Sequence, residues 1–340
     1  MRMTWRGTLN SDPWRDIAPP NASSAVNGRR VDAEGRWDFF WARDLDRRPL
    51  LVLRFSCETP AVRLPKPKGI EVALHGGDGQ HDSMLTLTLL EAEHRDIFYR
   101  LCTDIIAASS GATSEAEALA VTIARTWRWH HLLRGGRDAR LSSEEQKGLI
   151  GELLVLERHL LGAMPATDAV ASWTGPLGAP KDFEIGAICV EAKARRGAAT
   201  PAVAISSEHQ LDSRGSEALF LHVTDLARGA VDASGSFSVS DVAQRVASRV
   251  ADLDPGATEP LDSLLAAAGL RWDDDYSDCL WTEISTRLYE VRDDFPRLTS
   301  SGVPSGVSHV KYSISLADCE PYLVDVDRLK SLLEGTANGS

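Results

Sequence analysis

The chain has 340 residues, of which 43% are hydrophobic and 25% are charged, proportions typical of a soluble globular protein. No apolar run reaches 18 residues, so the sequence predicts no membrane-spanning helix. The formal net charge of −12 argues against a surface that coats nucleic acid as a whole, although it leaves room for a local basic groove.

The five cysteines are dispersed and lack the paired spacing of a metal site, which indicates reduced thiols. The first residues, Met-Arg-Met-Thr-Trp-Arg-Gly, lack the apolar stretch of a signal peptide. We therefore expect a cytoplasmic protein with no membrane partner.

The first 110 residues are predicted to form a β-rich N-terminal domain. Turn-forming prolines and glycines separate its candidate strands, which lie at residues 37–41, 50–55, 70–74 and 85–89. A helix from about residue 91 to 108 is expected to close this domain, which has no recognisable catalytic constellation.

Residues 111–250 are predicted to be helical at first and then α/β. A helix is expected over 114–133, and the next begins at Ser142-Ser143, where either serine makes a capping box with Glu145 or Gln146. Residues 251–340 form a predicted α/β extension that completes this core or packs on it. Further elements are expected at strands 202–206 and 219–223, helices 239–250 and 261–268, and strands 284–291 and 310–316.

Glu152 is a carboxylate inside the otherwise apolar run of the helix that begins near Ser142. Burying it unpaired would be costly, so we expect it to face a metal, a basic partner or water. A polar stripe on the edge of the helix is the alternative interpretation.

Basic side chains gather in two places. Lys181, Arg195 and Arg196 flank residues 182–193, and a larger group precedes them in the chain. That group consists of Arg125, Arg128, His130, His131, Arg134, Arg137 and Arg140. It predicts either a nucleic-acid groove or a solvated helix face with a basic end.

Residues 182–193 predict a tight β-hairpin with apolar and polar residues in alternation. Gly186-Ala187 forms its two-residue loop, and the leading glycine suits a type II′ turn. Closing the hairpin there places Asp182 opposite Glu191, with Lys193 two residues further on the same face. Facing carboxylates repel each other, so the pattern suggests a divalent metal and a phosphate at this position.

This arrangement leads to the hypothesis of a Mg²⁺-dependent nuclease centre. Carboxylates that hold Mg²⁺ and a nearby ammonium group can together support phosphodiester cleavage. Ala192 turns its methyl group to the opposite face of the strand, and its backbone carbonyl is a further candidate metal ligand. The alternative, an exposed hairpin with a cross-strand lysine–carboxylate contact, leaves Asp182 opposite Glu191 unexplained.

Asp182 followed by Glu191-Ala192-Lys193 resembles the PD-(D/E)XK nuclease signature, with Pro180-Lys181-Asp182 in place of a strict Pro-Asp. The wider sequence resembles the bacterial family called "putative PD-(D/E)XK motif protein" over most of the chain. The matching segments are Gly148-Leu-Ile-Gly-Glu-Leu, Trp173-Thr-Gly-Pro176, Asp182-Phe183, Glu191-Ala192-Lys193, Ile205-Ser-Ser, Gln210-Leu211, Phe295-Pro-Arg-Leu298, Gly306-Val307 and Val310-Lys-Tyr312.

The resemblance implies a restriction-endonuclease-like core of a helix, a mixed central sheet and a second helix, within an α+β or α/β protein. It further implies that Glu152 joins the metal shell, and that Gln210 lies on the strand after the signature, or at its end, and positions water or substrate. Members of the family are often encoded beside restriction-like and phage-defence genes.

Two functions follow as expectations. The first is a Mg²⁺-dependent DNA endonuclease, with Mn²⁺ as a possible substitute, acting in defence with partner proteins of helicase/ATPase or methyltransferase type and as a possible homodimer. The second is a non-catalytic DNA-binding or assembly subunit that has kept the fold. The intact set of Asp182, Glu191 and Lys193 favours the first. No GxSxG, HExxH or P-loop motif points to another enzyme class.

Overall fold

The computed structural model describes residues 12–21, 26–57, 62, 64–65, 67, 69–77, 82–133, 140–197, 201–230, 233–292, 294–304, 307 and 310–337. The chain divides into two compact units, one of Met1–Pro60 with Leu64–Arg134 and one of Ala61–Arg63 with Gly135–Ser340. Both units contain helices and β-sheet, so the predicted mixed α and β character is confirmed. No helix in the described ranges is long and apolar enough to cross a membrane.

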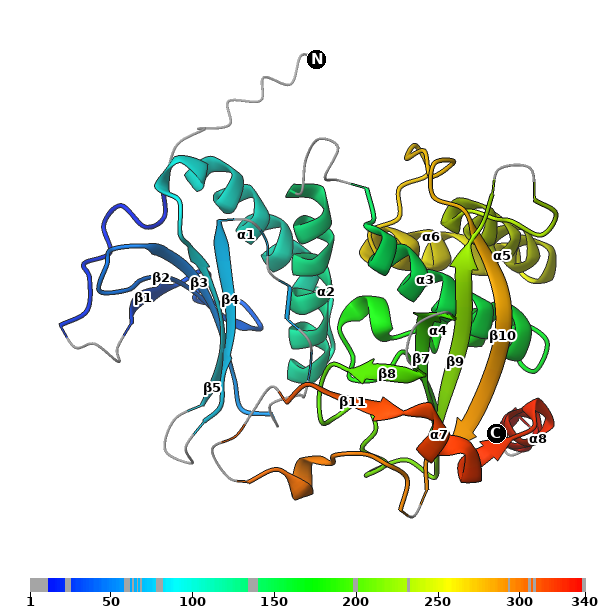
Figure 1. Cartoon of the computed structure of the whole chain (residues 1–340). Coiled ribbons are helices and arrows are strands. Elements are labelled where there is room, and N and C mark those ends of the chain that lie inside the picture. The colour runs from blue at the N-terminus through cyan, green and yellow to red at the C-terminus, as the bar shows by residue number, and fades with distance from the viewer. Residues whose placement is uncertain are drawn as a thin grey trace. The chain divides into compact units, whose positions relative to one another are not determined.

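The first unit contains a five-stranded antiparallel sheet and two helices (Figure 1). Its sheet has the order β1-β2-β3-β5-β4. The elements are β1 (Asn27–Arg30), β2 (Asp38–Arg43), β3 (Pro49–Phe55), β4 (Ile70–His75), β5 (Ser83–Leu89), a 3₁₀ turn (Ala92–His94), α1 (Arg95–Ser109) and α2 (Glu115–Leu133).

Helix α2 belongs to this first unit, whereas the sequence prediction placed it at the start of the nuclease core. The two helices pack together, and the buried hydroxyls of Ser109 on α1 and Thr122 on α2 lie 3.0 Å apart in a hydrogen bond. Trp14 anchors the core of the unit, because its fully buried ring stacks on Phe98 of α1 and meets Trp41 of β2 edge-on.

The second unit is built on a mixed five-stranded sheet of order β12-β10-β9-β7-β6, in which β7 and β9 pair in parallel and the other neighbours are antiparallel. Strands β8 and β11 form a separate antiparallel pair. The strands are β6 (Phe183–Ile185), β7 (Ile188–Arg196), β8 (Ala202–Ile205), β9 (Ala218–Arg228), β10 (Trp281–Glu290), β11 (Tyr312–Ser315) and β12 (Leu323–Val324). The helices are α3 (Ser143–Val155), a π-helical segment (Leu156–Leu160), α4 (Ala166–Ala171), α5 (Val239–Leu253), α6 (Thr258–Ala267), α7 (Leu316–Cys319) and α8 (Val326–Ala337), with 3₁₀ turns at Gly175–Leu177, Pro255–Ala257, Ser300–Gly302 and Glu320–Tyr322.

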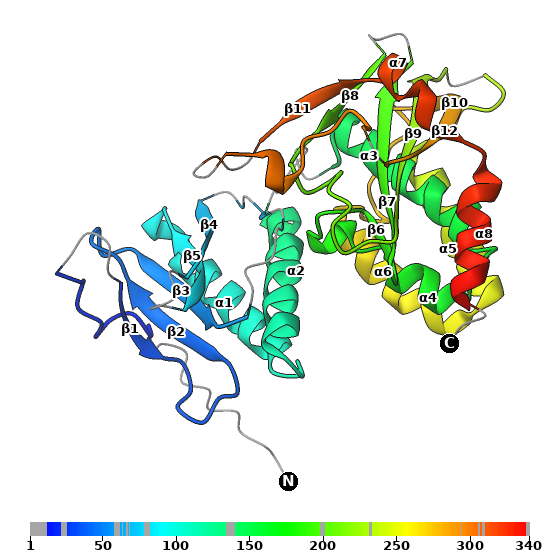
Figure 2. The same ribbon diagram turned by 90° about the horizontal axis from the view of Figure 1, so that it is seen from below.

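The two faces of this sheet carry different layers. Figure 2 shows α5, α6 and α8 on one side and the β8–β11 pair on the other. Alternation along β9 separates the two cores, since Phe220 packs in the helical layer while Leu219 and Leu221 pack with β8 and β11.

The predicted hairpin is confirmed. Phe183 pairs with Val190 and Ile185 with Ile188, and Gly186 has a φ of 58°, as the first position of a type II′ turn requires. Continuing this register places Asp182 across from Glu191, at the end where β6 begins.

A pair of buried histidines lies on the helical side of the sheet. His159, in the π-helical segment, and His222, on β9, have ring centroids 5.1 Å apart, and none of their ring nitrogens has a hydrogen-bond partner among the described residues. Burial lowers the pKa of His159 to about 4 and that of His222 to about 3. Both rings are therefore neutral in the fold at neutral pH.

We expect these histidines to make the protein acid-sensitive. In the unfolded chain they bind protons below about pH 6.5, whereas in the fold they resist protonation down to about pH 3–4, so stability falls as the pH falls through that window. At pH 5 each contributes a loss on the order of 1–2 kcal/mol. Urea unfolding between pH 7.5 and 5 should show a smaller loss for His222→Leu than for wild type, with the exposed His75→Leu as control. Identical pH profiles for wild type and His222→Leu would contradict this assignment.

Candidate active site

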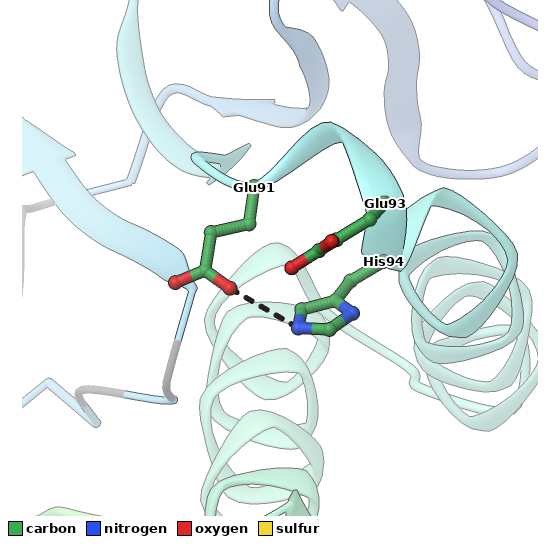
Figure 3. Close-up of side chains that lie close together, drawn as sticks. All are labelled: Glu91, Glu93 and His94. Atoms are coloured by element: carbon green, nitrogen blue, oxygen red, sulfur yellow. Dashed lines mark ion pairs between the residues drawn. The ribbon is translucent and has the colours of Figure 1, made fainter.

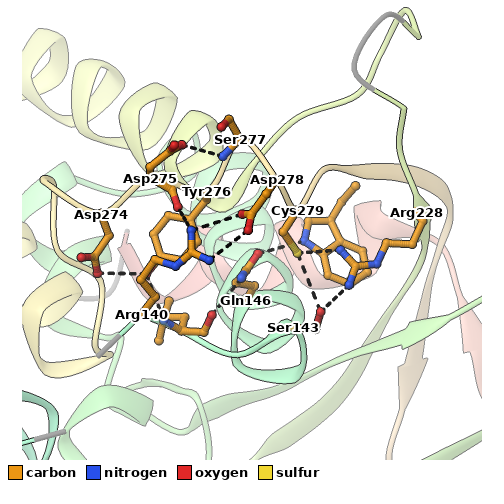
Figure 4. Close-up of polar contacts among 12 residues, drawn as sticks. Arg140, Ser143, Gln146, Arg228, Asp274, Asp275, Tyr276, Ser277, Asp278 and Cys279 are labelled. Atoms are coloured by element: carbon orange, nitrogen blue, oxygen red, sulfur yellow. Dashed lines mark hydrogen bonds and ion pairs between the residues drawn. The ribbon is translucent and has the colours of Figure 1, made fainter. Parts of the chain in front are cut away.

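Helix α3 is fixed at its N-terminus by a polar cluster (Figure 4). Ser142 caps the helix in a reciprocal capping box with Glu145, as predicted. The backbone N–H of Leu141 donates to the Tyr276 hydroxyl over 3.1 Å, and Arg140 pairs with Asp278. The start of the helix is thus held against the loop that precedes β10.

A glycine lets the middle of α3 approach β7 closely. A Cβ added at Gly151 would lie 3.2 Å from the Cβ of Ala194, a contact tighter than side chains normally make. Two small residues at the helix–strand contact therefore let α3, which carries Glu152 as its next residue, lie close to β7.

Glu152 is half-buried and is oriented by Trp173. The indole Nε1 of Trp173 donates to Glu152 Oε2 over 2.7 Å. Burial and the neighbouring charge of Asp182 raise the pKa of Glu152 well above its usual range, against the opposing effect of the Trp173 hydrogen bond. The side chain thus points toward the hairpin.

Asp182 is held from both its backbone and its side chain. Its carbonyl oxygen accepts hydrogen bonds from the N–H groups of Thr174 and Gly175, each 3.0 Å long. Its Oδ2 accepts from the backbone N–H of Ala192 over 2.8 Å, which ties the aspartate to β7. The predicted methyl orientation of Ala192 is confirmed, because this side chain packs in the helical core.

Glu191 is completely buried on the opposite face of β7. Lys193 Nζ forms an ion pair with its Oε1 over 2.6 Å, and Oε2 has no hydrogen-bond partner among the described residues. Lys193 also donates to Gln210 Oε1 over 3.1 Å. Gln210 lies in the turn after β8, where its Oε1 also accepts from the N–H of Ser206 over 2.7 Å.

The electrostatics of this group follow from a shortage of positive charge. Burial and the Asp182 charge raise the pKa of Glu191 to about 8, although Lys193 acts in the opposite direction. Burial disfavours the charged form of Lys193, but the carboxylates of Glu191 and Asp182 outweigh it, so the pKa of Lys193 is raised. Burial and the neighbouring carboxylates therefore favour the protonated form of Glu191, whereas the carboxylates favour the charged form of the lysine.

The comparison with known families bears on this arrangement. Residues 10–317 match the family model described as "Putative PD-(D/E)XK family member, (DUF4420)". The chain belongs to this PD-(D/E)XK family. No curated protein and no solved structure is significantly similar to the chain.

PD-(D/E)XK proteins are usually nucleases and typically use divalent metals, and the residues of this family member fit such an ion. Glu191 offers two buried oxygens, of which Lys193 contacts only Oε1, and Mg²⁺ prefers oxygen ligands. A buried carboxylate oxygen left without a donor, as Oε2 is, is costly unless a cation binds it.

Gly175 leaves space between the other two carboxylates. A Cβ at this position would lie 2.9 Å from Asp182 Oδ1 and 3.3 Å from Glu152 Oε2, so both oxygens border the volume that any side chain here would fill. The turn that carries Trp173 and Gly175 therefore orients one carboxylate and keeps the space beside two of them clear.

A second group of possible metal ligands lies in the first unit. Glu91, Glu93 and His94 bring three ligand atoms within 4.8 Å of one another (Figure 3). The Glu91 and His94 side chains are 43% and 42% exposed, and they pair with each other over 3.1 Å. Such surface groups are common without a metal, and this one lacks the PD-(D/E)XK residues.

The predicted basic cluster is divided between the two units of the chain. Arg125 belongs to the first unit and makes two hydrogen bonds to Asp104, whereas Arg140 belongs to the second unit and pairs with Asp278. Arg134 and Arg137 lie outside the described residues. Two of the basic side chains are therefore already neutralised by acidic partners.

The structure brings together the five side chains that the sequence singled out: Asp182, Glu191, Lys193, Glu152 and Gln210. Gln210 lies in a turn, just beyond the end of β8. Reasoning from individual residues missed Trp173 and Gly175, although both stand in the Trp173-Thr-Gly-Pro176 segment that carries the family resemblance. A glycine before a proline, directly ahead of the hairpin, was the available signal.

Replacing Glu191 by glutamine should stabilise the metal-free protein at high pH. Glu191 ionises near pH 4.5 in the unfolded chain but only at about pH 8 in the fold, so the wild type loses stability as the pH rises through this window. Glu191→Gln removes that loss and should be more stable on the order of 4 kcal/mol at pH 8. Urea unfolding in EDTA measures the difference, with the exposed Glu184→Gln of the same hairpin as control. A stability difference that does not depend on pH would disprove the assignment.

Adding a methyl group at Gly175 should weaken metal binding. The new Cβ of Gly175→Ala would intrude on Asp182 and Glu152, so we expect roughly a tenfold or larger loss of Mn²⁺ affinity in calorimetric titration. Gly148→Ala is the matched control, since a Cβ there meets nothing within 4 Å and lies in α3, where alanine favours the helix. Unchanged Mn²⁺ affinity in Gly175→Ala would place the metal elsewhere.

Proposed function

We propose that the protein is a Mg²⁺-dependent DNA endonuclease whose metal ligands are Asp182, Glu191 and Glu152, with the carbonyl of Ala192 as a further ligand. The observation that carries the proposal is the fully buried carboxyl group of Glu191, which lies beside two more carboxylates and has a single lysine, Lys193, in contact with it. The proposed core is restriction-endonuclease-like, with α3 and the mixed sheet as its first two parts.

Each side chain has a role in phosphodiester hydrolysis that follows from its position. A divalent cation held by Asp182, Glu191 and Glu152 would neutralise charge on the phosphate and lower the pKa of water. Lys193 presents a compact point charge that holds the attacking water or a phosphate oxygen. Gln210 fixes the Lys193 ammonium by accepting its hydrogen bond. Trp173 keeps Glu152 turned toward the cluster.

The proton on Glu191 links the metal to pH. The pKa of Glu191 is raised to about 8, so a cation held by Asp182, Glu191 and Glu152 would compete with this proton. Metal affinity should accordingly rise with pH through the neutral range.

The proposal extends to a role in a bacterial restriction-like or phage-defence system, with a helicase/ATPase or methyltransferase as partner. This extension rests on the family resemblance. The competing function, a non-catalytic DNA-binding or assembly subunit, predicts that the carboxylates hold no metal and that the protein cuts no DNA under any condition.

Lys193→Ala should separate catalysis from metal binding. We expect turnover on plasmid, linear duplex or single-stranded DNA in Mg²⁺ or Mn²⁺ to fall roughly 10²–10³-fold, because a positioned charge at the reacting group is lost. Mn²⁺ affinity should change only a few-fold. Asp182→Ala should abolish both cleavage and metal binding, while Glu184→Ala should retain both.

Reactions in EDTA provide the background rate. Cleavage that survives in both Asp182→Ala and Lys193→Ala would remove the proposed centre. Metal binding without cleavage in the wild type would indicate that a partner protein is needed for activity, and the absence of both would favour the assembly-subunit function.

A further inference from the structure

A second ammonium group, that of Lys181, lies at the proposed cluster with few partners. The Lys181 residue is 9% exposed, and its Nζ makes one long hydrogen bond, 3.4 Å, to the carbonyl oxygen of His209. An ammonium group has three N–H donors. Among the described residues, no carboxylate forms an ion pair with Lys181.

Lys147 shows the usual solution for a buried lysine in this protein. It is 5% exposed, and its Nζ pairs with Glu144 over 2.8 Å. Burial of a charge without such a partner is destabilising. Lys181 therefore has no carboxylate within ion-pair distance among the described residues, although Asp182 follows it directly in the chain.

Lys181 and Lys193 converge on the same turn after β8. Lys181 donates to the carbonyl of His209, and Lys193 donates to the side chain of the next residue, Gln210. The charge of Lys181 also acts on Glu191, where it opposes the rise of the carboxyl pKa. The two ammonium groups therefore act on the same carboxylate and are tied to consecutive residues.

We propose that Lys181 binds a phosphate group of the nucleic-acid backbone at the cluster, distinct from the role of Lys193. This inference rests on the proposed nuclease function. A phosphate oxygen would supply the missing counter-ion and the acceptors for the free N–H groups, and an ammonium suits it as a point charge. Because every nucleotide carries a phosphate, the contact would be independent of sequence.

The test compares Lys181→Met with wild type in binding to fluorescein-labelled 20-base-pair duplexes of two unrelated sequences. Anisotropy is measured in Ca²⁺ over a range of salt concentrations. Loss of one phosphate contact should reduce the slope of log Kobs against log salt by about 0.9 and should weaken both duplexes by the same factor. Lys330→Met, which removes an exposed lysine of α8, should leave affinity and slope near those of wild type. Lys181→Arg should retain most of the slope.

A second measurement distinguishes substrate binding from a structural role. Methionine has a side chain of similar length to lysine but carries no charge. Because the substitution removes a buried charge, Lys181→Met should melt a few degrees higher than wild type in EDTA. A structural lysine would instead give a lower melting temperature with an unchanged salt slope, and that result would overturn the proposal.

The two proposals can fail separately. If wild type binds duplex in Ca²⁺ and Lys181→Met has the same slope, the Lys181 site is wrong while the nuclease proposal stands. If wild type binds no duplex, the nuclease proposal loses its support, and the anion site is then tested with inorganic phosphate alone. Phosphate that raises the melting temperature of wild type but not of Lys181→Met would retain the anion site, and equal responses would overturn it.

Discussion

Electrostatic repulsion around the buried Glu191 carboxylate is the constraint on which the rest of the second unit depends. Burial and the charge of Asp182 raise the pKa of both Glu191 and Glu152, and Lys193 offsets only part of this effect. A fold that keeps these groups together must obtain its stability elsewhere. The large apolar core between the sheet and helices α3, α5, α6 and α8 is the evident source.

The helical core also determines the position of the acidic residues. Gly151 and Ala194 allow α3 to lie close to β7, and the cluster around Tyr276 fixes the start of the helix. Glu152 consequently reaches the end of the hairpin, although it lies 30 residues before Asp182 in the chain. Small residues in the packing interface thus do as much to build the site as the charged residues themselves.

Much of this arrangement follows from local sequence patterns. Alternation and the Gly186-Ala187 turn fix the hairpin register, and with it the relation of Asp182 to Glu191, because a tight turn leaves no freedom to slip. The capping box at Ser142 likewise fixes the start of α3. In both cases the determining residues are within a few positions of the structure that they specify.

The parts that the sequence did not predict depend on contacts between distant segments. A strand was predicted to begin at Ile284, whereas β10 begins at Trp281. A register shift between Glu283 and Ser285 leaves Ile284 outside the pairing and 58% exposed. The pairing of β8 with β11, which are more than 100 residues apart, cannot be read from the alternation of either strand. The hydrogen bond from Trp173 to Glu152 joins a loop to a helix in the same way.

Charge is distributed unequally between the two faces of the sheet, and this difference connects stability with function. The face that carries Glu191 and Lys193 also carries Arg195. Its guanidinium pairs with Asp225 over 2.6 Å, and Arg287 on β10 pairs with the same aspartate over 2.7 Å. On the helical face, burial keeps His159 and His222 neutral. A falling pH therefore has opposite effects on the stability of the two faces. It relieves the repulsion at Glu191, which is stabilising, but it tends to charge the buried histidines, which is destabilising. The metal-free protein should be most stable between these two effects, and a bound divalent cation would move that optimum toward higher pH, because it replaces the proton that Glu191 otherwise retains.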